Sequence, residues 1–151
     1  MAPFRFNLEK VLKVRQVETL KAKQSVAQAQ LVSGQAWVAV EKVRSERVAF
    51  EAAWEERRSS RRQTAREWTD SSQRHGALVE AEKAAVEALH AALAVVAEKR
   101  AELEEAERRE QALLKLREQQ EEAHEYAERA EEQIITDEIA QNTHRSVRGV
   151  G

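Results

Sequence analysis

Apolar residues recur at alternating steps of four and three residues along much of the chain. A first series runs from Leu8 to Trp54, and ten of its fourteen positions are apolar. A second series runs from Leu78 to Ala106, with seven of nine positions apolar. Helices that pair through a narrow seam, as in coiled coils, have this spacing. The pattern therefore predicts an all-α protein with two long helices.

The two predicted seams can be written out position by position. The first consists of Leu8, Leu12, Arg15, Thr19, Ala22, Val26, Ala29, Ser33, Ala36, Val40, Val43, Arg47, Phe50 and Trp54. The second consists of Leu78, Glu82, Ala85, Leu89, Ala92, Val96, Lys99, Leu103 and Ala106. It then resumes in a shifted phase at Leu113, Leu116, Gln120, Ala123, Ala127, Ala130 and Ile134. Such a shift predicts a local change of supercoil.

A polar stretch without this periodicity separates the two series. Thr69–Gly76 contains an Asp, two Ser and a Gly, which favour turns, and Asp70 with Gln73 forms a capping pattern. Asn7 is a suitable N-cap for the first helix. We therefore expect a first helix at about 7–69, a turn at about 70–76 and a second helix at about 77–143. Together they predict one antiparallel coiled-coil hairpin domain over 1–151.

The position of the turn also predicts which residues face each other. With a bend near residue 73, the numbers of facing positions add to about 146 in an antiparallel pair. Leu12 is then opposite Ile134, and Trp54 is opposite Ala92. One continuous helix that forms a dimer is the alternative that periodicity leaves open.

Composition and charge favour the hairpin over the long dimer. Charged residues make up 34% of the chain and aromatic residues 5%, with four Gly and one Pro, as in long helices. Residues 1–75 contain 15 Lys or Arg and 9 Asp or Glu, whereas residues 76–151 contain 10 and 18. The halves thus carry +6 and −8 charges and attract each other when they lie side by side, although exposed pairs contribute at most ~1 kcal/mol each.

Several classes of protein and site find no support in the sequence. The four histidines, His75, His90, His124 and His144, form no metal-binding i, i+4 pair, and there is no glycine-rich phosphate loop. Carboxylates on solvated helices lack the burial that prepares them for acid–base catalysis. We therefore expect no enzyme activity, no cofactor and no metal.

The expected location is the cytosol. The chain has no cysteine, no apolar run of membrane-spanning length and no signal-peptide pattern at its start. A function in binding other proteins is the remaining expectation.

Three stretches of the chain resemble the flagellar export protein FliJ family. Phe4–Arg15 resembles the aromatic-basic-aromatic start of that family, and Ala112–Gln119 is similar to its late leucine- and lysine-rich segment. Glu132-Gln133 followed by Asp137–Ala140 is similar to its acidic C-terminal signature, from which Ile134, Ile135 and Thr136 depart. In the hairpin, these motifs are expected to meet at one end.

The resemblance implies a stalk-like adaptor built as a two-helix antiparallel coiled coil. Its implied partners are the flagellar export ATPase hexamer, the cytosolic domain of the export gate and export chaperones. Association with the cytoplasmic face of the inner membrane would then occur only through these partners.

The sequence also indicates candidate partner-binding residues, each with a structural alternative. Phe4 and Phe6 either staple the helix start or insert into a partner. Trp68, and Arg58 and Arg62 in the Arg57–Arg66 cluster, either contact a partner or form a solvated face near the turn. The same alternatives hold for Arg15 near the start and for the acidic signature. Its candidate residues are Glu132, Gln133, Asp137 and Glu138.

Two other functions remain as alternatives. One is a homologous stalk of an injection-type secretion system or of a rotary ATPase. The other is a nucleic-acid-binding coiled coil that uses the arginine cluster, which the acidic facing half disfavours. No nucleic acid is therefore expected among the partners.

Overall fold

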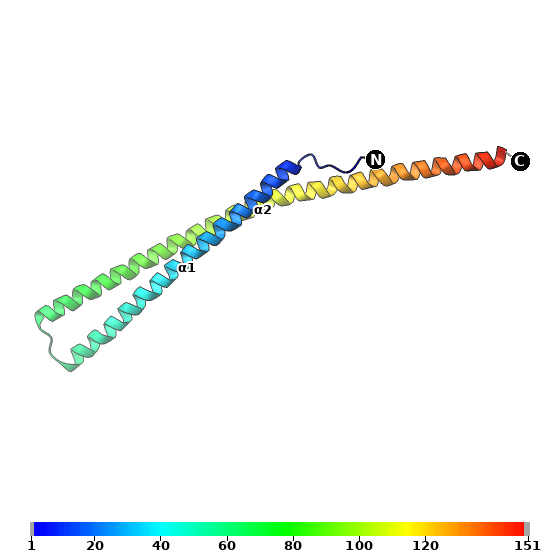
Figure 1. Cartoon of the computed structure of the whole chain (residues 1–151). Coiled ribbons are helices and arrows are strands. Elements are labelled where there is room, and N and C mark those ends of the chain that lie inside the picture. The colour runs from blue at the N-terminus through cyan, green and yellow to red at the C-terminus, as the bar shows by residue number, and fades with distance from the viewer. Residues whose placement is uncertain (1, 150–151) are drawn as a thin grey trace. The chain divides into compact units, whose positions relative to one another are not determined.

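The computed structural model describes residues 2–149 and contains two long helices (Figure 1). α1 is Glu9–Ser60 and α2 is Ala65–Gly149, and no strand occurs within residues 2–149. α1 starts two residues after the predicted start, and α2 continues beyond the predicted end at 143. The predicted all-α class is confirmed. Within residues 2–149, neither helix contains a segment that is long and apolar enough to cross a bilayer.

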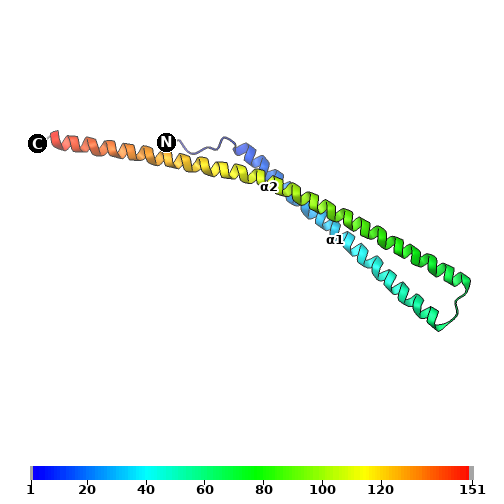
Figure 2. The same cartoon turned by 180° about the vertical axis from the view of Figure 1, so that it is seen from behind.

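The contacts divide the chain into two units, which we describe separately. The hairpin unit is Leu20–Glu105, and the terminal unit combines Met1–Thr19 with Ala106–Gly151. In the hairpin unit, α1 and α2 run antiparallel and are joined by the four residues 61–64, as both views show (Figures 1 and 2). The ion pair Arg44–Glu82, 3.1 Å, and the contact between Glu51 and His75, 2.9 Å, define this pairing.

The turn lies earlier than the sequence predicted. Helix α1 ends at Ser60 rather than near 69, and the expected turn at 70–76 is part of α2. The Thr64 hydroxyl accepts a hydrogen bond from the Glu67 N–H, 3.1 Å, and so caps α2. Thr64 and Glu67 also have the three-residue spacing of a capping box. This cap, rather than the Asp70–Gln73 pattern, marks where the second helix starts.

The polar cluster at 69–76 is helical because its residues continue the seam. Ser71 is buried and His75 half-buried, at steps of four and three before Leu78. Gly76 has no positive φ, so it makes no use of the conformation that turns require. Ser, Asp and Thr lower helix propensity by at most ~0.7 kcal/mol each, which packing along the seam offsets.

The core is the predicted seam. In the hairpin unit its buried apolar residues are Val26, Ala29, Val40, Leu78, Leu89, Ala92 and Val96, all at predicted positions. In the terminal unit, Leu12 and Thr19 are buried at predicted positions, together with Phe6. Leu8, the first predicted seam residue, lies just before α1 and is exposed.

The facing residues differ from those predicted. The numbers of the paired residues add to 126 in Arg44–Glu82 and in Glu51–His75, instead of the predicted sum of about 146. The sum is lower because the turn lies earlier, and moving the turn by one residue changes this sum by two. Trp54 therefore lies against Trp68 rather than Ala92, with ring centroids 5.2 Å apart. In the terminal unit, Glu9 pairs with Arg117, so the predicted facing of Leu12 and Ile134 is wrong.

Burial after Glu110 does not follow the predicted shifted phase beyond Leu116. Leu113 and Leu116 of the shifted series are half-buried, but so are Arg117 and His124, which belong only to the unshifted steps from Ala106. Ala123 and Ala130, which belong only to the shifted series, are exposed. Alanine is a strong helix former that is tolerated in solvent, so its spacing on an unpaired helix does not report a seam.

We expect Leu89→Asp to destabilise the hairpin unit by about 3–5 kcal/mol, because it places an unpaired charge in the buried seam. Leu89 is 6% exposed. The measurement is thermal unfolding followed by circular dichroism. Leu93→Asp on the same helix is the matched control, since Leu93 is 50% exposed. Equal melting temperatures for the two variants would contradict the packing described above.

We expect Gly76→Ala to stabilise the protein by up to about 1 kcal/mol, because alanine replaces glycine inside a helix. An added Cβ at Gly76 meets no heavy atom within 4 Å. Gly34→Ala is the control, since Gly34 is also helical with the same open space. Urea unfolding measures both variants. If a turn existed at 70–76, Gly76→Ala would be destabilising instead.

Candidate functional site

An aromatic cluster closes the turn end of the hairpin unit. The rings of Trp54 on α1 and Trp68 on α2 lie 5.2 Å apart, and Trp54 donates a hydrogen bond to Gln63, 3.4 Å. The guanidinium of Arg58 lies 5.2 Å from the Trp54 ring and 5.9 Å from the Trp68 ring. Cation–π contacts of this kind restrain an arginine that is otherwise free to move. Arg58 is also paired with Glu55.

Two of the predicted site residues, Arg58 and Trp68, are thus in direct contact. Trp68 remains 47% exposed, so part of its ring is available to a partner. Arg62 is exposed and, together with Arg58 and Trp68, lines a shallow hollow of about 480 Å³. The residues of this hollow are Arg58, Ser59, Ser60, Arg61, Arg62, Gln63 and Trp68. The structure therefore brings the three candidates near the turn together.

A polar network lies next to the aromatic cluster along the seam. His75, whose ring lies 5.7 Å from that of Trp54, contacts the Glu51 carboxylate through Nε2, 2.9 Å. Arg47 donates to Glu51, 3.0 Å, and pairs with Glu82, which also accepts a bond from Arg44, 3.1 Å. This network ties α1 to α2 on both sides of the buried seam residue Leu78.

The network changes the acidity of its carboxyl groups. Hydrogen bonds from His75 and then Arg47 lower the pKa of Glu51 below its ordinary value. Hydrogen bonds from Arg47 and then Arg44 lower the pKa of Glu82 in the same way. The two carboxylates in turn raise the pKa of Arg47, Glu82 more than Glu51. Both carboxylates stabilise the folded state in their charged form.

The terminal unit contains the other predicted site residues. Phe6 is 7% exposed, which agrees with a role in the helix start, and its carbonyl accepts a bond from the Glu9 N–H, 3.2 Å. Phe4 is half-buried, with its ring 5.7 Å from that of His124 on α2. Arg15 is half-buried and paired with Glu18, 3.0 Å. These aromatic residues thus contact their own chain.

The acidic signature lies on a part of α2 whose side chains are all exposed, residues 129–149. Glu132, Gln133, Asp137 and Glu138 all belong to this segment, and Gln133 donates a hydrogen bond to Asp137, 3.1 Å. The sequence predicted that the three FliJ-like motifs meet at one end of the hairpin. The first two motifs do contact each other, since Glu9 of the first pairs with Arg117 of the second, 3.7 Å. The contacts with the first motif extend along α2 as far as His124, through Phe4, and so stop before the acidic signature.

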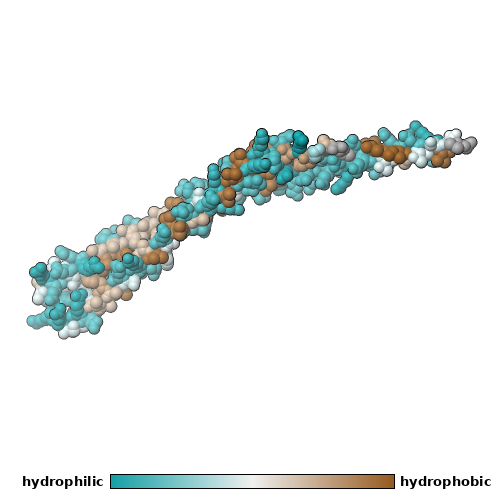
Figure 3. Space-filling model, in the orientation of Figure 1, coloured by the Kyte–Doolittle hydropathy of each residue, from teal (hydrophilic) through white to brown (hydrophobic). Residues whose placement is uncertain are grey.

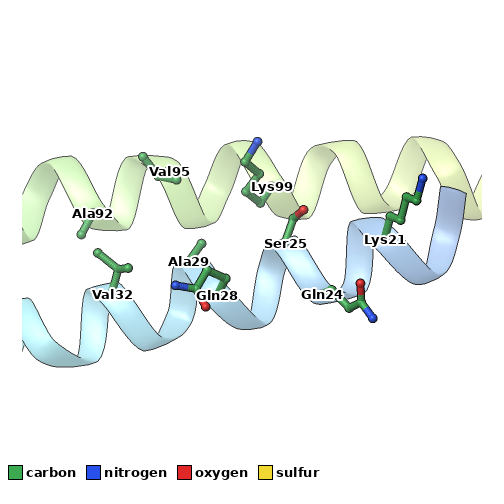
Figure 4. Close-up of a pocket in the computed structure, with 9 residues that line it drawn as sticks. All are labelled: Lys21, Gln24, Ser25, Gln28, Ala29, Val32, Ala92, Val95 and Lys99. Atoms are coloured by element: carbon green, nitrogen blue, oxygen red, sulfur yellow. The ribbon is translucent and has the colours of Figure 1, made fainter.

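Sequence reasoning missed a groove in the hairpin unit. Its volume is about 710 Å³, and Figure 4 shows the side chains of α1 and α2 that line it. The lining residues are Lys21, Gln24, Ser25, Gln28, Ala29, Val32, Ala92, Val95 and Lys99. The signal in the sequence is the pair of small seam residues Ala29 and Ala92, which leave space between the helices. Predicting the groove required the correct facing of the two helices.

Within residues 2–149, no group of three or more His, Asp or Glu side chains has the arrangement of a metal site.

We expect the hairpin unit to lose stability in acid through Glu82. Because the folded-state pKa of Glu82 is lowered, its contribution is fully present above the unfolded value near 4.5 and disappears as the pH falls through the folded value. Glu82→Gln should therefore reduce the difference between the melting temperatures at about pH 7 and pH 3. Glu80→Gln, at an exposed position on the same helix, is the control and should retain the full difference. Identical pH profiles for Glu82→Gln and the unmodified chain would contradict the network.

Comparison with known proteins identifies the family. The sequence matches the profile of the family described as Flagellar FliJ protein over residues 4–149, nearly the whole chain. Searches of curated proteins and of solved structures found no significant match. The matched family is a non-enzymatic flagellar protein family that is related to export. The chain therefore belongs to the flagellar FliJ protein family.

Proposed function

We propose that this protein is a stalk-like adaptor of the flagellar type III export apparatus. Its proposed partners are the export ATPase hexamer, the cytosolic domain of the export gate and export chaperones with their cargo. The proposed location is the cytoplasmic face of the inner membrane, which the adaptor reaches through the export apparatus. Family membership over residues 4–149 carries the flagellar part of this proposal and favours it over the injection-type and rotary-ATPase alternatives.

The two sets of candidate residues support the adaptor role because they belong to different units. Arg58, Arg62 and Trp68 lie at the turn of the hairpin unit, where the side chains are basic and aromatic. Glu132, Asp137 and Glu138 lie in the terminal unit, on the exposed stretch of α2. Surfaces of opposite charge favour different partners, since like charges across an interface are costly. A protein with two such surfaces is suited to connecting two others.

The two paired helices also give the hairpin unit a defined length. About 40 residues of each helix rise 1.5 Å per residue, which corresponds to roughly 60 Å. Contacts connect the helices at several levels within this unit, through Trp54 and Trp68, through Arg44 and Glu82, and through the buried seam residues Val40 and Leu89. Such a rigid element can hold partners at a fixed separation. The proposed mechanism is therefore geometric.

We expect the two surfaces to be separable in binding experiments with the purified export ATPase and the cytosolic domain of the gate. Arg58→Gln with Arg62→Gln should weaken one of these contacts at least tenfold, as for hot-spot arginines. Glu132→Gln with Asp137→Asn and Glu138→Gln should weaken the other. Biolayer interferometry measures each affinity, and stimulation of ATP turnover reports the contact with the ATPase.

Glu104→Gln with Glu121→Gln and Glu122→Gln is the matched control, because it removes three exposed negative charges elsewhere on α2. It should leave both affinities within about twofold of the unmodified chain. Loss of the same partner with both test variants, or unchanged binding with both, would reject an adaptor with two separate surfaces.

A further inference from the structure

Arginines predominate at the turn of the hairpin unit, where Glu56 and Glu67 are the nearest acidic residues along the chain. Five arginines and no acidic residue occur between positions 57 and 66. Arg57 and Arg58 are in the last turn of α1, Arg61 and Arg62 are in the connection, and Arg66 is in the first turn of α2. The space-filling view shows mainly hydrophilic side chains gathered at this end of the hairpin unit (Figure 3). The charge therefore belongs to the end of the hairpin rather than to one helix face.

Most of these arginines are not neutralised by the described part of the chain. Arg58 pairs with Glu55, and Arg61 lies 3.9 Å from Glu67. The guanidinium groups of Arg57, Arg62 and Arg66 have no ion pair or hydrogen bond within residues 2–149, and all three residues are exposed. Three cations are thus available for an external anion.

The rest of the hairpin unit has the opposite charge. Leu20–Glu105 contains 14 Lys or Arg and 14 Asp or Glu, so its net charge is zero. Without the five arginines of 57–66, 9 basic and 14 acidic residues remain, with a net charge of −5. The hairpin unit is therefore an electric dipole whose positive end is the turn. Near an anionic surface, such a dipole orients with the turn toward that surface.

Trp68 adds an apolar contact next to these charges. It is 47% exposed, and its inner face is held against Trp54. Tryptophan is enriched where proteins meet the headgroup region of a bilayer, because its ring is amphipathic. Clusters of four to eight basic residues are typical of segments that bind anionic lipids.

We propose that the turn of the hairpin unit binds directly to a bilayer surface that contains anionic phospholipids. A flat surface can reach arginines on both helix ends and on the connection at once, whereas a helix or peptide partner would favour a charge on one face. A long nucleic acid fits less well, because beyond the turn it would meet the acidic remainder of the unit. This contact goes beyond the proposed adaptor function, in which the membrane is reached only through proteins.

The test uses the full chain and sedimented vesicles, either pure phosphatidylcholine or an equal mixture with phosphatidylglycerol. We expect binding to the mixed vesicles, no binding to the neutral ones, and loss of binding between ~50 and ~500 mM salt. Each basic residue near an anionic surface increases the affinity about fivefold, so Arg57→Gln with Arg62→Gln and Arg66→Gln should reduce it roughly a hundredfold.

Arg100→Gln with Arg145→Gln and Arg148→Gln is the control, since it removes three exposed arginines that lie outside positions 57–66 of the sequence. It should change the affinity much less than the turn variant, and circular dichroism should show equal helicity for both. Equal losses in the two variants, or binding that does not depend on phosphatidylglycerol, would overturn the proposal.

A second arm replaces the vesicles with duplex DNA or with the purified cytosolic domain of the gate. Binding to either of these through the three arginines, with no binding to mixed vesicles, would also overturn the proposal. Binding to mixed vesicles without any added protein would support it independently of the adaptor function.

Discussion

The packing of α1 against α2 depends on a narrow seam in which small and medium-sized side chains alternate with polar ones. Leu12 and Val40 are each 1% exposed, but many other seam positions are only half-buried. Two helices side by side have little interior, so each buried residue accounts for a large share of the apolar burial. The helices therefore need additional contacts wherever the seam is weak.

Polar and aromatic groups supply those contacts near the turn. Arg47 connects Glu51 on its own helix with Glu82 on the other, and His75 connects Glu51 to the ring cluster. Arg58 covers the rings of Trp54 and Trp68. Several of these groups are partly exposed, so each pair contributes modestly, and their joint arrangement matters more than any one bond. The same arrangement leaves Arg57, Arg62 and Arg66 at the turn without an ion pair to any residue of 2–149.

The separation of charge along the chain connects this packing with function. The excess of arginine lies at the turn, and the exposed acidic signature, Glu132 to Glu138, lies on the last part of α2. An adaptor of an export apparatus must bind different partners without confusing them, and opposite charges provide a simple means of discrimination. Membership of the flagellar FliJ protein family is the reason to expect that these two surfaces bind components of the flagellar export apparatus.

The sequence by itself determined the helical class, the seam and the family. Leu89, Val40 and Ala92 were assigned to the core from spacing alone, since a helix repeats its faces every 3.6 residues and neighbours cannot change that period. The start and late segments that resemble FliJ could likewise be recognised without coordinates. Of the candidate site, Arg58, Arg62 and Trp68 could be named, but their shared hollow could not.

Only the tertiary structure decided the turn and everything that depends on it. The polar cluster at 69–76 has the composition of a turn, yet the cap at Thr64 and the seam positions of Ser71 and His75 keep it helical. Moving the turn by one residue moves the residue that faces a given position by two. The earlier turn at 61–64 therefore changed both predicted pairings, Leu12 with Ile134 and Trp54 with Ala92. Local preferences are small compared with packing along a whole helix, so the packing of the two helices, together with the cap at Thr64, fixes where the chain reverses.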